Sequence, residues 1–179
     1  LGTTGAGDIA RMMAAGTLPA REIETIAGST GTDTVTLLSA GSPTVVTAVE
    51  TVIGTGGTDG VQLMAALGAP LAVTDVATVI GTASSDAARL LGAGTYSLSS
   101  IETAIGAAAS GDNIELMSAM AVSVSAVDSI LGTAGTDSVV LMAADTVKVS
   151  MIDTVRGSSG ADTVVMLGDD VPVTVSLIE

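Results

Sequence analysis

A glycine recurs along this chain of 179 residues at a nearly constant interval, and it restricts the possible folds more than any other feature. Successive copies are 26, 26, 27, 25, 26 and 25 residues apart, and an aspartate follows each copy after five or six residues. A fixed period along a whole chain is typical of repeat architectures, in which each unit stacks on its neighbours. The seven pairs are Gly2 and Asp8, Gly28 and Asp33, Gly54 and Asp59, Gly81 and Asp86, Gly106 and Asp112, Gly132 and Asp137, and Gly157 and Asp162.

The apolar residues within each unit follow the period of β-structure. After the aspartate they alternate with polar residues, as in D-T-V-T-L at 33–37 and D-T-V-V-M at 162–166. A period of two is expected of a strand, whereas a helix has a period of 3.6. Further apolar positions stand ten, eight, five and two residues before the next glycine, as at 71, 73, 76 and 79. The two steps of three residues indicate bends, so each unit is predicted to contain three short strands.

These patterns predict an all-β fold, a parallel β-helix or β-solenoid of seven coils with 25–27 residues per coil. The coils would begin near residues 2, 28, 54, 81, 106, 132 and 157. Stacking would bury the apolar faces and pair the backbone groups of each coil. Residues 1–179 would form a single repeat domain, which we expect to be a fragment of a longer chain because both end units are incomplete. A flattened roll of two sheets is the alternative.

Composition argues against an enzyme. Hydrophobic residues make up 47% of the chain, yet Tyr96 is the one aromatic residue and there is no His, Cys, Phe or Trp. Short aliphatic side chains suit a narrow layered interior. The eight methionines are interpreted as core filler without a common repeat position. Catalysis needs one special constellation, and neither the scattered basic residues nor the isolated acids provide one.

The net charge of −14 arises mainly from the repeat. Besides the seven aspartates, an acid stands four residues before most of the glycines. Together the two positions hold 13 of the 19 acidic residues. Such acidity disfavours nucleic acid and anionic lipid as partners, and no apolar run is long enough to span a bilayer. In the predicted coils the acids would form ladders, whose repulsion must be offset by solvent, N–H donors or cations. The acids of the second position are Glu24, Glu50, Glu102, Asp128, Asp153 and Glu179, with Ala77 replacing one copy.

Four loops resemble the glycine-rich nonapeptide of RTX (haemolysin-type) calcium-binding repeats, whose consensus is G-G-x-G-x-D-x-U-x with U apolar. They read G-S-T-G-T-D, G-T-G-G-T-D, G-T-A-G-T-D and G-S-S-G-A-D, and all four have Ser or Thr at the second consensus glycine. The resemblance implies Ca²⁺ held between coils. The alternative is that each aspartate closes a turn by accepting backbone N–H groups. The implied carboxylate ligands are Asp33, Asp59, Asp137 and Asp162, and the implied carbonyl ligands are Gly31, Gly57, Gly135 and Gly160.

We therefore expect a structural rod or filament-forming module of a large secreted or cell-surface bacterial protein, such as an adhesin stalk, a surface layer or an extracellular fibre. It would associate end to end with other copies or with flanking repeats. The alternative is a ligand-binding solenoid that recognises glycan or ice through ladders of hydroxyl groups. One predicted ladder is Thr25, Thr51, Thr78, Thr103, Ser129 and Thr154, and the other is Thr47, Thr74, Ser99, Ser125, Ser150 and Ser176.

Overall fold

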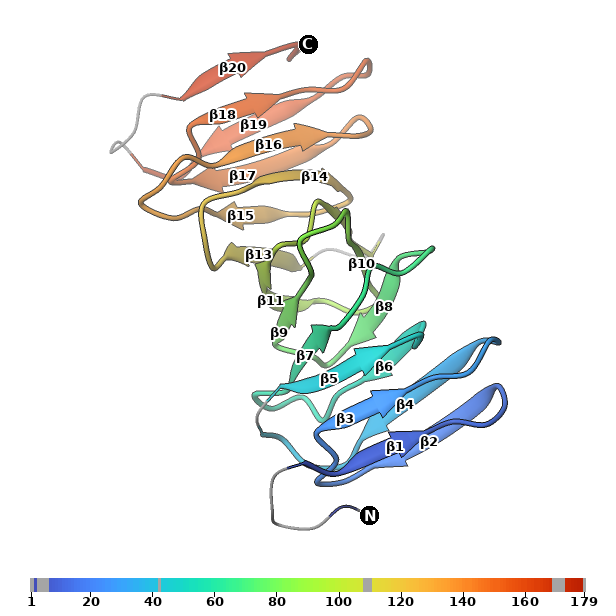
Figure 1. The fold of residues 1–179 in the computed structure, drawn as a ribbon. Coiled ribbons are helices and arrows are strands. Elements are labelled where there is room, and N and C mark those ends of the chain that lie inside the picture. The colour runs from blue at the N-terminus through green and yellow to red at the C-terminus, as the bar shows by residue number, and fades with distance from the viewer. Residues whose placement is uncertain (1, 3–6, 42, 108–110, 169–172, 179) are drawn as a thin grey trace.

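The computed structural model describes residues 2, 7–41, 43–107, 111–168 and 173–178 and shows a β-solenoid (Figure 1). Within these residues the regular structure consists of strands, and no helix could cross a membrane. The strands are β1 (Ile9–Arg11), β2 (Gly16–Ala20), β3 (Thr25–Ala27), β4 (Asp33–Leu37), β5 (Thr44–Thr47), β6 (Thr51–Ile53), β7 (Gly60–Leu63), β8 (Leu71–Thr74), β9 (Thr78–Ile80), β10 (Ala87–Leu90), β11 (Gly94–Ser99), β12 (Thr103–Ile105), β13 (Asp112–Leu116), β14 (Ala121–Ser125), β15 (Ser129–Leu131), β16 (Ser138–Leu141), β17 (Thr146–Ser150), β18 (Thr154–Arg156), β19 (Thr163–Met166) and β20 (Thr174–Ser176).

The strands alternate between two parallel sheets. The odd-numbered strands form one sheet and the even-numbered strands form the other, which we call the odd sheet and the even sheet. Each turn of the solenoid therefore contains two strands, and there are about nine turns of about 17 residues. At about 4.8 Å per turn the rod is about 43 Å long. The prediction of seven coils of 25–27 residues is wrong, and the flattened roll of two sheets is the arrangement found.

The prediction of three strands in each sequence unit is confirmed for the six units from 2 to 156, and the described residues of the last unit contain two strands. The unit from 28 to 53, for example, contains β4, β5 and β6. The predicted number of strands per solenoid turn was wrong. One turn is complete after two strands, so a unit of three strands covers one and a half turns. A bend that turns the apolar side inward looks the same in sequence whether the coil has two sides or three. What distinguishes the two is which strands pair, and the pairing joins residues about 17 positions apart, such as Val35 and Val52, which the local pattern does not record.

A unit of one and a half turns places successive aspartates on opposite edges of the solenoid. We call edge 1 the side where the chain passes from the odd to the even sheet, and edge 2 the side where it returns. Two aspartates on one edge are three turns apart, about 14 Å at the spacing of parallel strands. The predicted aspartate ladder with one acid per coil is therefore absent from the described turns. Edge 1 carries Asp33, Asp86 and Asp137, and edge 2 carries Asp8, Asp59, Asp112 and Asp162.

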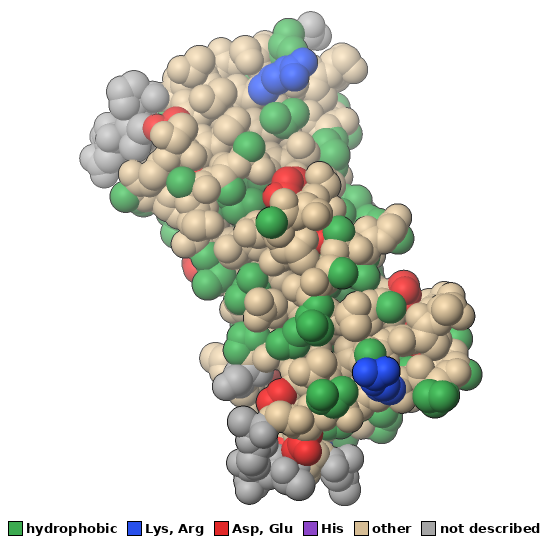
Figure 2. Space-filling model, in the orientation of Figure 1, with side chains coloured by type: hydrophobic (Ala, Val, Ile, Leu, Met, Phe, Trp, Pro, Cys, Tyr) green, Lys and Arg blue, Asp and Glu red, His purple; other side chains and the backbone are tan. Residues whose placement is uncertain are grey.

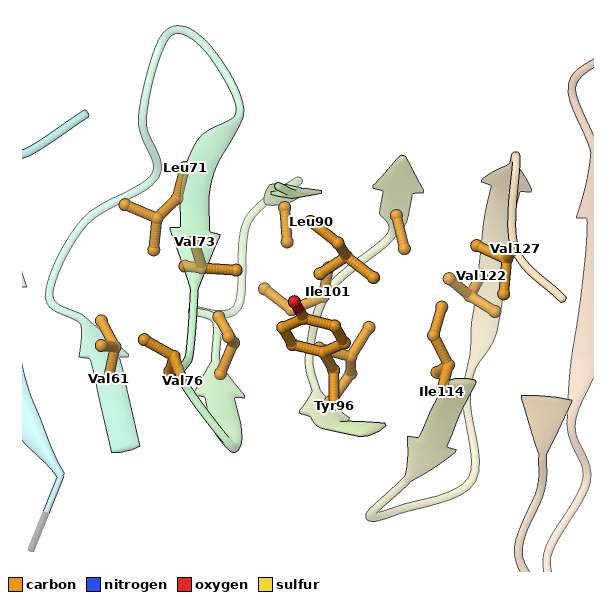
Figure 3. Packing of buried hydrophobic residues seen from close by; sticks show 14 of the residues in the cluster. Val61, Leu71, Val73, Val76, Leu90, Tyr96, Ile101, Ile114, Val122 and Val127 are labelled. Atoms are coloured by element: carbon orange, nitrogen blue, oxygen red, sulfur yellow. The ribbon is translucent and has the colours of Figure 1, made fainter. Parts of the chain in front are cut away.

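The core is a column of aliphatic side chains between the two sheets (Figure 3). Most strands contribute alternate residues, as in β4, where Asp33, Val35 and Leu37 are buried. Tyr96 is buried in the same column, where β8 has Leu71 at the corresponding position. The flanking even-sheet strands β10 and β12 have the small residues Ala88 and Ala104 at their inward positions. Reduced volume on one sheet thus accommodates the ring on the other.

The recurring glycine is required by a close backbone approach. Gly28 follows β3, and its N–H donates to the Thr47 carbonyl oxygen at 2.8 Å. A Cβ at Gly28 would overlap the carbonyl oxygen of Ala48, a residue with φ of 50°. All seven units repeat this arrangement of a glycine against the carbonyl of a non-glycine residue with positive φ. Any larger residue would have to displace backbone, which accounts for the invariance of glycine along the chain.

Candidate functional site

The turn around Asp33 shows what the repeat aspartate does. The side chain is completely buried, and its Oδ2 accepts hydrogen bonds from the backbone N–H and the hydroxyl of Ser29. Its Oδ1 accepts the Gly16 N–H from the preceding turn at 3.1 Å. One carboxylate therefore closes its own loop and ties that loop to the neighbouring turn.

The hydroxyl residue after the glycine completes the same network in other units. Thr55, Thr82, Thr133 and Ser158 donate both N–H and hydroxyl to the aspartate four residues later. These hydroxyls also accept the N–H two residues on, at 3.0–3.4 Å, as Ser29 does from Gly31 at 3.2 Å. Ser or Thr at the second glycine of the RTX consensus thus has a hydrogen-bonding role in these five turns. The sequence showed this substitution but not its partners.

The acid four residues before the glycine forms the other half of the network. Glu50 Oε2 accepts the backbone N–H of Asp33, 17 residues earlier, at 2.7 Å. The same bond joins acid and aspartate in four further turns at 2.7–3.1 Å. The two acidic positions therefore lie on adjacent turns of the solenoid that a hydrogen bond joins, and N–H donors offset their charge. These four pairs are Glu24 with Asp8, Glu102 with Asp86, Asp128 with Asp112, and Asp153 with Asp137.

The turn at Asp59 lacks this acid because Ala77 occupies its position. No acceptor is recorded for the Asp59 N–H among the described residues, in contrast to the five turns that have a carboxylate. A hollow of about 200 Å³ opens beside Ala77, lined also by Gly57, Asp75 and Gly94. The hollow marks an incomplete turn network in the middle of the rod.

The carboxylates fit calcium unequally. Asp33 and Asp162 have both oxygens occupied by N–H or O–H donors, and Asp137 has the same arrangement with Met120 N–H on Oδ1. Calcium needs six to eight oxygen ligands, so a cation there would have to displace these donors. Asp59 differs, because its buried Oδ1 has no partner. In the described part no three acidic side chains gather as a metal site. Calcium binding stays a prediction.

The four glycines implied as carbonyl ligands have a packing role that the sequence did not reveal. A Cβ at Gly31 would lie 2.6 Å from Ala15 Cβ, which belongs to the loop one turn earlier. Glycine at this position lets two loops stack closely. Gly57, Gly135 and Gly160 face Ala40, Ala119 and Ala144 in the same way, at 3.1, 2.6 and 2.8 Å.

Two equivalent carboxyls in these turns differ in acidity. Burial opposes ionisation of Asp33, but the hydrogen bonds from Ser29 and Gly16 outweigh it and lower the pKa below the ordinary 3.8. Burial also raises the pKa of Asp112, and here the Ala107 N–H opposes the rise too weakly while the Asp128 carboxylate adds to it. Ala107 has no hydroxyl to donate, and Asp112 Oδ1 is buried without a partner.

The predicted hydroxyl ladders are divided between the two sheets. Thr25 lies on β3 in the odd sheet and Thr51 on β6 in the even sheet, and the later members continue to alternate. Thr47 on β5 and Thr74 on β8 begin the same alternation in the second set. Members on one face are therefore three strands apart, so neither predicted set forms a continuous row on a single face.

A pair of large apolar residues, which the sequence analysis missed, ends the first strand of every unit. Its inner member is Leu or Met, and the five central copies are at most 6% exposed. Its outer member is also Leu or Met but is 42–93% exposed in all seven units. Six of the eight methionines belong to these pairs, so the interpretation of methionine as unplaced core filler is wrong. The pairs are 12–13, 37–38, 63–64, 90–91, 116–117, 141–142 and 166–167.

The charged side chains that are exposed to solvent do not have the acidic balance of the whole chain. All five basic residues are exposed, whereas three of the sixteen acids in the described part are (Glu22, Asp75 and Glu115). Figure 2 accordingly shows few charged side chains, set apart on a surface of neutral and hydrophobic groups. The acidity resides mainly in buried or half-buried turn carboxylates, which net charge alone could not show.

Comparison with known proteins found no matching family model, no matching curated protein and no matching solved structure.

Proposed function

We propose that this chain is a structural rod, a repeat module of a secreted or cell-surface protein. The observation that carries the proposal is the turn network, which recurs on both edges and, as at Asp33, joins a loop to the turns before and after it. Such a network serves the continuity of the rod and uses most of its acidic groups in doing so. The proposed partners are other copies or flanking repeats, joined end to end through the solenoid.

The sheet ends support end-to-end contact. In the described part β19 pairs on one side with β17, and β20 pairs on one side with β18. Side chains that are buried at central positions are exposed there: Met166 is 57% exposed, whereas the equivalent Leu141 is 2% exposed. An unpaired strand of this kind is a template for another strand. Electron microscopy at increasing protein concentration tests this point: rods that lengthen support it, and rods of constant length contradict it.

The rod proposal and the calcium prediction are tested by one titration. Protein stripped with a chelator is followed by circular dichroism and calorimetry while calcium is added. A β-signal before addition shows that the core and turn hydrogen bonds hold the rod without metal. Uptake of several ions per chain with a higher melting temperature supports calcium as a stabiliser. A stripped chain that stays unfolded with and without calcium would overturn the rod as an autonomous module.

A glycan or ice ligand stays a prediction. The division of both hydroxyl sets between two sheets removes the main feature that favoured it.

A further inference from the structure

The outer members of the seven apolar pairs form two rows, which we call row 1 and row 2. Within each row, successive members are 50–53 residues apart, which is three turns of the solenoid or about 14 Å. The exposed fractions of these side chains range from 42% for Leu38 to 93% for Met13. Single exposed apolar residues are common, but a large one at the same outward position in every unit is not. Row 1 on edge 1 is Met13, Met64, Met117 and Leu167, and row 2 on edge 2 is Leu38, Leu91 and Met142.

The rows are held rigidly. The Met64 N–H donates to the Val46 carbonyl oxygen at 2.9 Å, which continues the ladder between β7 and β5 by one residue. Leu38, Leu91, Met117, Met142 and Leu167 make the equivalent bond to the preceding turn at 2.8–2.9 Å. These side chains thus project from ladder positions and not from free loops. Rigid presentation lowers the ordering cost of association.

The surroundings of the rows permit close approach of another protein. Among the residues that the structure describes, Glu115, two residues before Met117, is the exposed acid nearest to row 1 in sequence, and the equivalent residue before Met64 is the neutral Gln62. Along row 2 the equivalent residues are Thr36, Arg89 and Val140. The rows therefore do not carry the acidity of the chain, and long-range repulsion from the buried carboxylates is reduced by salt.

The twist of the rows and the interval between their members restrict which partner can bind along them. Figure 1 shows that the sheets twist along the rod, with β8 and β10 steeply inclined relative to β2 and β4. An apolar row on such an edge follows the twist, and its contacts recur every three turns. A partner must match both the twist and the 14 Å interval along several turns, and a second copy of this chain has both by construction. Met suits such a contact because its flexible side chain adapts to a neighbouring surface.

We propose that rows 1 and 2 are lateral interfaces between copies of this chain. This inference deepens the rod proposal, on which it rests, by naming a side-to-side contact in addition to the ends. Because one and a half turns separate successive units, the rod has an equivalent row on each edge. Pairing through one edge leaves the other edge free, so lateral association does not stop at two copies.

The test is sedimentation equilibrium of the whole chain from about 1 µM to about 1 mM, the range in which weak protein pairs form. The row 1 variant carries Met13→Gln, Met64→Gln and Met117→Gln, and the row 2 variant carries Leu38→Gln, Leu91→Gln and Met142→Gln. The matched control carries Leu131→Gln and Met151→Gln, two apolar residues that are each 40% exposed but lie outside the rows.

The wild type and the control should exceed the mass of a dimer as concentration rises, and more strongly in high salt. Each single-row variant should pair side to side with one other copy only, and the variant of both rows should form no side-to-side pair, with a dissociation constant for this contact at least about tenfold higher. Scattering distinguishes side-to-side pairing from end-to-end growth: the cross-section should thicken for the wild type, the control and the single-row variants, but not for the variant of both rows. A wild type that is monomeric throughout overturns the inference, as does a variant of both rows that associates like the wild type. Neither result affects the folding of the single chain, which is the test of the rod, whereas a wild type that is monomeric throughout also contradicts end-to-end contact between copies.

Discussion

The turns at Asp33 and Asp112 are built on the same pattern but differ in how well their carboxylate is satisfied. Asp33 has a hydroxyl and two N–H donors, and its backbone N–H is capped by Glu50. Asp112 has one recorded N–H donor, from Ala107, and a buried oxygen without a partner. Its pKa is raised, whereas that of Asp33 is lowered. The comparison shows that the repeat keeps the backbone geometry more strictly than the hydrogen bonds that stabilise its charge.

The largest expected effect is common to both turns. Gly28→Ala would drive a Cβ into the Ala48 carbonyl, and Gly106→Ala would do the same at Ala126. Because backbone must move in either case, we expect each variant to lose more than about 3 kcal/mol of unfolding free energy. Urea denaturation measures both. Gly41→Ala is the control, since nothing lies within 4 Å of the added Cβ. A mild effect at Gly28 would contradict the close-approach explanation.

Replacing the carboxylate should change the melting temperature by different amounts in the two turns. Asp33→Asn removes charge from a site where three donors favour it, so the melting temperature should fall clearly. Asp112→Asn removes a buried charge that has one donor and lies near Asp128, so the fall should be much smaller or reversed. Calorimetry at pH 7 compares the two. Equal losses would show that the differences in hydrogen bonding do not control stability.

The pH dependence should differ in sign. Since the pKa of Asp33 is below 3.8 in the fold, its contribution is present above that value and is lost as the pH falls through the lower folded pKa. Since the pKa of Asp112 is above 3.8, the folded state holds the proton more tightly and gains stability as the pH falls through the raised pKa toward 3.8.

Melting curves from pH 7 to pH 2 can resolve these two contributions. The wild type should gain stability relative to Asp112→Asn on mild acidification, and it should lose its advantage over Asp33→Asn below about pH 4. Parallel curves for the wild type and both variants would contradict the assignment of the two shifts.

The smallest expected effect on stability comes from the Ser29 hydroxyl, which has no counterpart in the Asp112 turn. Ser29→Ala should cost about 1 kcal/mol by removing one donor to Asp33, and Ala107→Ser should stabilise the Asp112 turn by up to about that amount. The Ala107→Ser variant should also lower the pKa of Asp112, which carboxyl NMR can follow. Thr30→Ala provides a control at an exposed neighbour. If Ala107→Ser changes neither the stability nor the pKa of Asp112, then the longer loop at 107–111, and not the missing hydroxyl, causes the difference between the Asp33 and Asp112 turns.

The sequence showed the positions of most residues of the candidate site, but it did not show which of them are hydrogen-bonded to each other. The aspartates, the second acids and the Ser or Thr residues were each identifiable by their period. Glu50 accepts the N–H of Asp33 because these residues stack one turn apart, which the sequence does not show. The bond from Ser29 to Asp33 spans only four residues, but it depends on the conformation of the loop between them. The Leu/Met pairs were present in every unit, yet the outer member cannot be told from core residues until the end of the strand is known.

The sequence by itself determined that the chain is β-structured, that it repeats, and that each unit contains three strands, because alternation records which side chains face inward. The tertiary structure alone decided that two strands close a turn, so that three-strand units alternate between two edges. The reason is physical: alternation records which side chains face inward within a strand, but which strands lie next to each other depends on pairing between residues about 17 positions apart, such as Thr34 and Thr51. The acid partners, the divided hydroxyl rows and the two apolar rows all follow from that closure.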